Sequence, residues 1–208
     1  MDAAGVLPSF TGIVVHDAWA PYDCYRAATH ALCNAHLLRE LVAVVETAGV
    51  DERGWCWAEQ VRDALLELKT LVEQAIANGA ATLDPAVLAL HTGRIRSAAL
   101  IAAQATRGRS DPLAARRHAL ARRILDRQAD YLRCATDFRV PFDNNAAERE
   151  IRMVRLREKV SGCLRTLAGA RNFAAIRSYL ATAAKHGMGF LHVLIELVQG
   201  NPWLPATA

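Results

Sequence analysis

Residues 142–150, Phe-Asp-Asn-Asn-Ala-Ala-Glu-Arg-Glu, place a carboxylate one turn inside a predicted helix that then becomes strongly basic. Asn144 or Asn145 can cap the start of this helix with its side-chain oxygen. Four charged residues follow at spacings of four, three and four, which puts them on one helical face: Glu148, Arg152, Arg155 and Lys159. One acid and three cations on one stripe are suited to holding a metal ion beside nucleic acid. The structural alternative is that Glu148 closes a capping box with Asn145.

A second stretch, residues 12–17 with the sequence Gly-Ile-Val-Val-His-Asp, is an apolar run that stops at an acid. A buried parallel strand delivers a carboxylate to the edge of a sheet in this way. Asp17 on a strand end and Glu148 on a helix would together be the minimum needed to hold a divalent metal. Asp17 can equally be a cap for whatever follows the strand, so each acid taken alone has a structural interpretation.

The composition predicts a folded, soluble, cytoplasmic protein. The chain has 208 residues, of which 52% are hydrophobic, enough to bury the core of one large domain or of one domain with an insertion. It contains no apolar run of the roughly 18 residues that a membrane span needs, and its start lacks a signal-peptide pattern. Its five cysteines form no Cys-x-x-Cys pair, which favours reduced thiols over a zinc cluster. Cys33 and His36 are the nearest approach to a ligand pair, and we interpret them as a packed thiol and a surface histidine.

Charge is distributed unevenly along the chain. Residues 1–93 carry 5 basic and 12 acidic side chains, whereas residues 94–208 carry 20 basic and 9 acidic ones. This polarity suggests that the second half meets a polyanion, because Lys and Arg that neutralise phosphates supply most nonspecific affinity for nucleic acid. Nearly all of the basic residues are arginines, a bias that suits phosphate recognition but that high-GC codon usage also produces. A solvated helix surface is the alternative for most of them.

The remaining pattern predicts a largely helical chain with two or three short strands near its start. The strands are expected at residues 12–15 and 30–33, with a loop after the first of them that carries Trp19 and Tyr22. Apolar periodicity and start and stop signals predict the helices, at about 35–47, 55–77, 85–106, 112–135, 145–159, 168–185 and 188–199. Two of these begin with the same signal, an aspartate followed by proline, at Asp84 and Asp111.

Several blocks of the sequence resemble bacterial insertion-sequence transposases of the insertion sequence 66 family. The blocks are Val-His-Asp-Ala-Trp-Ala-Pro-Tyr at 15–22, Leu-Cys-Asn-Ala-His-Leu-Leu-Arg-Glu-Leu at 32–41, Asp-Asn-Asn-Ala-Ala-Glu-Arg at 143–149, Ser-Gly-Cys at 161–163 and Arg-Ser-Tyr-Leu-Ala-Thr-Ala at 177–183. Each block alone is a weak signal, but their order agrees with the family and they extend over nearly the whole chain.

This resemblance implies an α/β fold, namely part of a ribonuclease-H-like core that is predominantly helical and carries a helical insertion. It implies a DDE triad in which Asp17 matches the second acid and Glu148 the third, both catalytic and both ligands of Mg²⁺ or Mn²⁺. The implied divisions are 1–50 for the second-acid strand and following elements, 51–135 for the insertion, and 136–208 for the third-acid helix and C-terminal helices. The cations expected to grip the DNA of the transposon ends are Arg149, Arg152, Arg155, Lys159 and Arg165.

The first acid of the triad would lie before Met1 in this alignment. We therefore expect the chain to act with an upstream transposase segment or as a homo-oligomer, and to show no strand transfer by itself. A third ligand within the chain would most readily be Asp143 or Asp23. The alternative is a non-catalytic fragment that binds DNA or assembles with a full-length partner. Trp19 and Tyr22 can stack on a base, although aromatic residues more commonly pack in a core.

Overall fold

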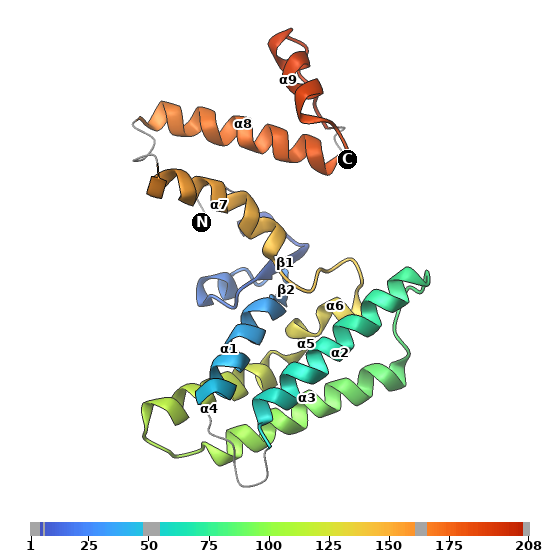
Figure 1. The fold of residues 1–208 in the computed structure, drawn as a ribbon, viewed down its shortest axis with the longest axis vertical. Helices are drawn as coiled ribbons and strands as arrows, with labels where there is room; N and C mark the ends of the chain where they lie inside the picture. The colour runs from blue at the N-terminus through green and yellow to red at the C-terminus, as the bar shows by residue number, and fades with distance from the viewer. Residues whose placement is uncertain (1–4, 6, 48–54, 161–165, 206–208) are drawn as a thin grey trace. The chain divides into compact units, whose positions relative to one another are not determined.

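Two short parallel strands form the sheet at the start of the chain. The computed structural model describes residues 5, 7–47, 55–160 and 166–205, with the side chains of 153–160 excepted. After a 3₁₀ turn η2, Leu7–Ser9, strand β1, Ile13–His16, pairs in parallel with β2, Thr29–Leu32, and its last residue lies opposite Leu32. A second 3₁₀ turn, η3, Ala20–Cys24, lies in the connection between the strands. The carboxyl ends of both strands therefore lie at the same edge of the sheet (Figure 1).

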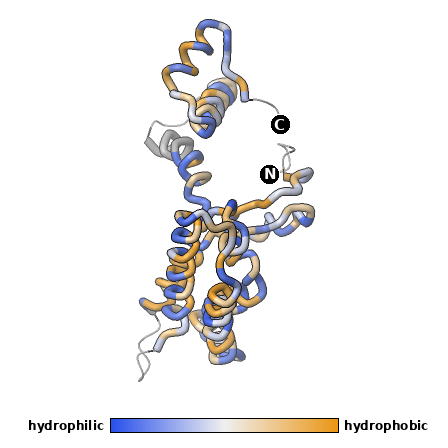
Figure 2. Tube along the Cα trace, turned by 90° about the vertical axis from the view of Figure 1, so that its right-hand side faces the viewer, coloured by the Kyte–Doolittle hydropathy of each residue, from blue (hydrophilic) through white to orange (hydrophobic). Residues whose placement is uncertain are grey.

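Four longer helices follow and hold most of the core. They are α1, Asn34–Thr47, α2, Trp57–Ala77, α3, Pro85–Ala105, and α4, Pro112–Asp126. Hydrophobic and hydrophilic residues alternate along these helices (Figure 2), and the apolar faces meet around Leu37, Leu41, Leu65 and Ile124. The spacing of apolar residues predicted α1 and α2 and several of the side chains that they bury, including Leu37, Leu41 and Leu65, but it wrongly placed Val42, which is 40% exposed, on the apolar face of α1.

The two aspartate–proline start signals behave as predicted. The Asp84 carboxylate accepts hydrogen bonds from the backbone N–H groups of Ala86 and Val87 at the start of α3. The Asp111 carboxylate accepts one from Ala114 at the start of α4, and this bond holds the pKa of Asp111 below its usual value. Each acid thus satisfies backbone donors that have no partner inside the helix.

The prediction of one continuous helix over residues 112–135 was wrong. The chain bends after α4 and continues as two single turns, α5, Gln128–Tyr131, and α6, Arg133–Thr136. Arg127 leaves helical geometry at φ −117° and ψ 26°, and the carbonyl oxygen of Tyr131 accepts a hydrogen bond from the Asn34 side chain, 97 positions earlier in the chain. At Tyr131, a side chain from a distant part of the sequence therefore replaces the backbone donor of a regular helix, because the N–H of Ala135 binds the carbonyl oxygen of Leu132 instead.

Contacts divide the chain into two units, Met1–Asn144 and Asn145–Ala208. The second consists of α7, Asn145–Val160, α8, Leu167–Lys185, and α9, Phe190–Val198. The Tyr179 hydroxyl in α8 donates to the carbonyl oxygen of Val193 in α9 and accepts from the backbone N–H of Trp203, which fastens the end of the chain to these helices.

The described residues are mostly helical, with two short parallel strands near the N-terminus. This agrees with the expected α/β class, and the third strand that the sequence allowed is not found among the residues described. Both strands end one residue away from the predicted limits, at His16 and Leu32. Among the described helices, none is long and apolar enough to span a membrane.

Candidate metal and nucleic-acid site

Asp17 lies at the carboxyl end of β1, exposed to solvent. Its Oδ1 accepts a hydrogen bond from the backbone N–H of Trp19 at 3.2 Å. Ala18 between them has a φ of 66°, in the left-handed region that residues with a side chain rarely adopt. Such backbone strain often accompanies functional loops, and here it shapes the turn that presents the carboxylate.

His16, immediately before Asp17, points the other way into the protein, because successive side chains of a strand alternate between faces. Its Nε2 lies 3.0 Å from His30 Nδ1 in β2, and His30 Nε2 lies 3.2 Å from the carbonyl oxygen of Tyr25. A carbonyl oxygen only accepts, so a neutral His30 carries its proton on Nε2 and its Nδ1 is an acceptor. His16 then donates from Nε2, and its buried Nδ1 has no hydrogen-bond partner among the described residues.

Burial, the positive charge of Arg127 and the neighbouring His30 together lower the pKa of His16 from its usual value to about 4. Asp23 and Asp17 oppose this shift. The imidazole is consequently neutral near neutral pH. Its ring also packs on Tyr22, with the ring centroids 4.7 Å apart.

Asp23, in η3, completes a cluster with the two histidines. One possible ligand atom from each of His16, Asp23 and His30 can be chosen so that all three lie within 4.8 Å of one another. The Asp23 Oδ1 is also 2.8 Å from the Arg127 guanidinium, which in turn pairs with Asp130 at 3.0 Å. The sequence had suggested Asp23 only as a possible partner of Asp17. Nothing in the spacing of residues 16, 23 and 30 indicated that two histidines would join it.

In the second unit, α7 carries the predicted acid and cations. Glu148 lies in its first turn and is half-buried, whereas Arg149 and Arg152 are exposed. Neither arginine forms an ion pair with any described residue, although Arg149 Nε makes a long 3.4 Å hydrogen bond to the carbonyl oxygen of Asn145. The Arg155 and Lys159 side chains, and Arg165 entirely, lie outside the described residues. Elsewhere on the helix, Glu150 pairs with Arg177 of α8 at 3.3 Å.

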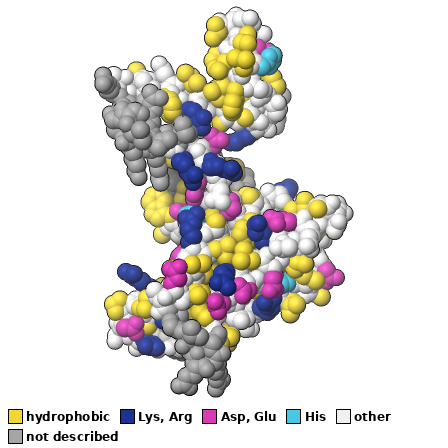
Figure 3. Space-filling view, viewed as in Figure 1, with side chains coloured by type: hydrophobic (Ala, Val, Ile, Leu, Met, Phe, Trp, Pro, Cys, Tyr) yellow, Lys and Arg dark blue, Asp and Glu magenta, His cyan; other side chains and the backbone are white. Residues whose placement is uncertain are grey.

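The arginines of α3 to α6 behave differently, because many of them are neutralised within the fold. Figure 3 shows basic and acidic side chains beside one another over the first unit, Met1–Asn144. The pairs formed by arginines 94 to 139 are Arg94–Glu67, Arg109–Asp111, Arg122–Asp126, Arg123–Glu40, Arg127–Asp23, Arg127–Asp130, Arg133–Asp130 and Arg139–Asp137. The count of 20 basic side chains in residues 94–208 therefore overstates the cations that these helices can offer to a polyanion.

The predicted site residues are divided between the two units. Asp17 belongs to the first unit and Glu148 to the second, so their separation is not defined. Asp143 is half-buried near the end of the first unit. Of the two aromatic candidates, Trp19 is 57% exposed and lies edge-on to Tyr22, with the ring centroids 6.1 Å apart. Trp19 is therefore available on the surface beside Asp17, and the alternative of core packing does not apply to it.

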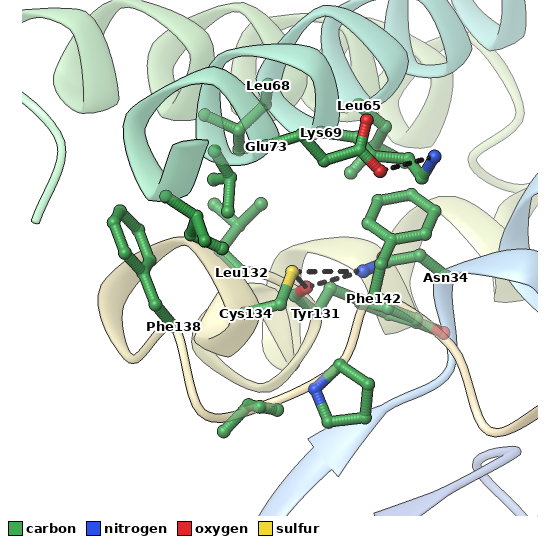
Figure 4. A pocket seen from close by; sticks show the side chains of 14 residues that line it. Asn34, Leu65, Leu68, Lys69, Glu73, Tyr131, Leu132, Cys134, Phe138 and Phe142 are labelled. Atoms are coloured by element: carbon green, nitrogen blue, oxygen red, sulfur yellow. Dashed lines mark hydrogen bonds and ion pairs between the residues drawn. The ribbon is translucent and has the colours of Figure 1, made fainter. Parts of the chain in front are cut away.

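An apolar pocket of about 150 Å³ lies elsewhere in the first unit, between α2 and the segment from α5 to Phe142 (Figure 4). The buried Asn34 lies in its wall and donates from Nδ2 to the Tyr131 carbonyl oxygen at 3.0 Å and to Cys134 Sγ at 3.6 Å. Lys69 and Glu73 form an ion pair at the pocket. Burial raises the pKa of the Cys134 thiol to about 11, so the pocket has no reactive thiolate near neutral pH.

Comparison with protein families supplies an independent observation. A family model described as "Transposase IS66 family" matches residues 2–172, which is most of the chain and includes Asp17, Glu148 and the three-residue cluster. Comparison with curated proteins and with solved structures found no match.

Proposed function

Because the chain belongs to the insertion sequence 66 family of transposases, we propose that it contributes two acids and a DNA-binding helix to a DDE-type transposase. In this proposal Asp17 is the second acid and Glu148 the third acid of the catalytic triad. The substrate is the DNA of transposon ends, and the reaction is cleavage of a phosphodiester followed by strand transfer. Family membership supports a transposase-related role, and the individual residue assignments are the part to be tested.

The fold assignment belongs to the same proposal. We interpret residues 1–50 and 136–208 as parts of a ribonuclease-H-like core and residues 51–135 as a helical insertion. The parallel pairing of β1 and β2, with an acid just beyond the first strand, supports this interpretation. Ligands commonly bind beyond the carboxyl ends of parallel strands.

The carboxylates fit a hard divalent cation. Asp17 is exposed, its turn engages one of its two oxygens, and oxygen ligands of this kind suit Mg²⁺ or Mn²⁺. When bound, such an ion would activate the attacking hydroxyl or water and stabilise the leaving oxygen of the phosphodiester. The strained turn at Ala18 would hold the Asp17 carboxylate in position, and the exposed Trp19 would offer a surface on which a base can stack.

The observation that carries the proposal for DNA is the difference between α7 and the preceding helices. Arg149 and Arg152 are exposed and form no ion pairs with described residues, beside a half-buried Glu148. Cations already paired with acids, such as Arg122 with Asp126 at 2.8 Å, must break that pairing before they can contact a phosphate. We therefore expect α7, with Arg155, Lys159 and Arg165 continuing its basic stretch, to supply the phosphate contacts.

Binding to duplex DNA at several salt concentrations tests this assignment. Replacing Arg149 and Arg152 together with alanine should weaken binding about equally for all sequences and flatten the slope of log K against log salt by about one to two. The matched control replaces Arg122 and Arg139, which are paired with Asp126 and Asp137, and should leave the slope nearly unchanged. An unchanged slope for the α7 variant would contradict the proposed interface.

Catalysis is tested separately with Asp17→Asn. Asparagine keeps the oxygen that accepts from Trp19, so the fold should be retained while the negative charge is lost. Cleavage in Mg²⁺ would be assayed with the chain alone and with a co-expressed segment that supplies the family's first acid. We expect activity only in the second case, and its loss in Asp17→Asn and Glu148→Gln but not in Asp126→Asn. Retention of DNA without cleavage in every case would instead support the non-catalytic alternative.

A further inference from the structure

We propose that His16, Asp23 and His30 form a Zn²⁺ site that fastens the β1–β2 connection, distinct in position and ligand chemistry from the carboxylate site assigned to Asp17. The two ring nitrogens that face one another, His16 Nε2 and His30 Nδ1, are 3.0 Å apart. A carboxylate oxygen of Asp23 completes a set of three ligand atoms within 4.8 Å of one another. Two ligands bonded to zinc at roughly 2.0–2.2 Å lie at most about 4.4 Å apart, so small movements of these side chains would bring the three atoms onto one ion.

The donor set selects the class of metal. Two imidazole nitrogens with one carboxylate suit Zn²⁺ and related transition metals, whereas Mg²⁺ prefers oxygen ligands and retained waters. Three protein ligands would leave a fourth tetrahedral position for water. The Asp17 side chain itself offers only carboxylate oxygens, so the two sites should prefer different ions.

The surroundings of His30 and Asp23 resemble the outer shell of a metal centre. His30 Nε2 is within 3.2 Å of the Tyr25 carbonyl oxygen, which orients the ring and leaves Nδ1 for coordination. A histidine that binds metal commonly donates its other ring N–H to a carbonyl or carboxylate in this way. Arg127 contacts Asp23 through Oδ1, and a carboxylate has a second oxygen that can coordinate. When His16 Nε2 binds the metal, the ring proton would move from Nε2 to Nδ1. This change of tautomer releases no proton.

The positive charge of Arg127 near the cluster limits its affinity for Zn²⁺. Arg127 is close enough to repel a cation, and its charge is partly offset by Asp23 and Asp130, with which it pairs at 2.8 and 3.0 Å. We therefore expect binding weaker than that of a structural zinc centre made of thiolates. The competing interpretation is a polar network that needs no metal, in which the His16–His30 hydrogen bond simply joins the two strands.

The position of the ligands gives the site a role. His16 ends β1, Asp23 lies in η3, and His30 lies in β2, so one ion would close the connection that carries Asp17. His16 is buried and the adjacent Asp17 is exposed. Zinc would stiffen the loop that carries the Asp17 carboxylate, and its binding does not depend on whether Asp17 is catalytic.

Zinc binding can be measured directly on the full chain after treatment with a chelator. Titration against a chromogenic zinc chelator should show one bound equivalent, and the Tm should rise with Zn²⁺ but not with the same concentration of Mg²⁺. His30→Ala should weaken binding by at least about tenfold. Asp23→Asn should do the same, and because Asp23 is exposed this variant tests the site even if His30→Ala fails to fold.

Two controls separate this site from other sources of binding. His192→Ala removes an exposed histidine of α9 and should leave the affinity unchanged. Cys33 Sγ and His36 Nδ1 lie 3.2 Å apart and form the rival ligand pair. Substituting Co²⁺ for zinc distinguishes the two pairs, because the rival pair contains a sulfur ligand and the proposed site does not. A sulfur-to-cobalt charge-transfer band would assign binding to a thiolate and overturn the proposal. Absence of zinc binding, or equal affinity in Asp23→Asn and the unmodified chain, would overturn it as well.

Discussion

Replacing Asn34 should reveal how strongly one buried side chain holds α5 and α6 against the start of α1. Asn34 is 1% exposed, and its Nδ2 donates to the carbonyl oxygen of Tyr131 at 3.0 Å. Asn34→Ala leaves that buried carbonyl without its partner, at a cost of about 1–3 kcal/mol. It also removes the Oδ1 atom, which is buried without a hydrogen-bond partner among the described residues. Because burying such an atom is unfavourable, its removal offsets part of the destabilisation. We expect a net decrease of about 1–2 kcal/mol in the free energy of unfolding.

Asn34→Asp is the sharper variant. A carboxylate has the same shape but cannot donate to the Tyr131 carbonyl, and it places an unpaired charge in the interior. The expected decrease is therefore larger, about 3–5 kcal/mol. Urea denaturation followed by circular dichroism gives these free energies, and amide hydrogen exchange should show faster opening of α5 and α6 in both variants.

The control is Asn78→Ala, which makes the same substitution at an exposed position at the end of α2 and should change stability by less than about 0.5 kcal/mol. Two results would refute the reasoning. One is an Asn34→Ala variant as stable as the control, and the other is an Asn34→Asp variant no less stable than Asn34→Ala. Either would mean that the Tyr131 carbonyl finds another partner or that water reaches this part of the pocket wall.

Three other predictions concern the first unit. Leu41→Ala removes a side chain with no exposed surface and should lower the unfolding free energy by about 2–5 kcal/mol in urea denaturation. Asp84→Ala removes the hydrogen-bonding cap of α3 and should cost about 1 kcal/mol, most of which Asp84→Asn should restore. Burial raises the pKa of Cys134 from 9.0 to about 11, so at pH 8 iodoacetamide should modify the exposed Cys24 much faster, as followed by mass spectrometry. The unfolded thiol ionises first as pH rises, so stability should fall between pH 9 and about 11, and a stability independent of pH there would contradict the shift.

The sequence alone predicted the elements whose signals are local. Apolar residues at helical spacing located α1 and α2 within a residue or two, and the aspartate–proline pairs marked the starts of α3 and α4. The apolar run before Asp17 was likewise correctly interpreted as a strand that ends beside an acid. These features were predictable because a helix cap, a helical face and a strand end each depend on residues a few positions apart. The family was also recognisable from short blocks in a conserved order along one chain.

Only the tertiary structure decided which distant side chains meet. The helix predicted for 112–135 is interrupted at Arg127, and the Asn34 side chain binds the carbonyl oxygen of Tyr131 from 97 positions away. The tertiary structure also paired Arg123 with Glu40 at 2.6 Å, which removed a cation from the surface that charge counting had assigned to a polyanion. The histidine and aspartate cluster arises in the same way, from parallel pairing that brings His30 beside His16. Local periodicity specifies which face of an element is buried, but the partner of that face depends on how the whole chain packs.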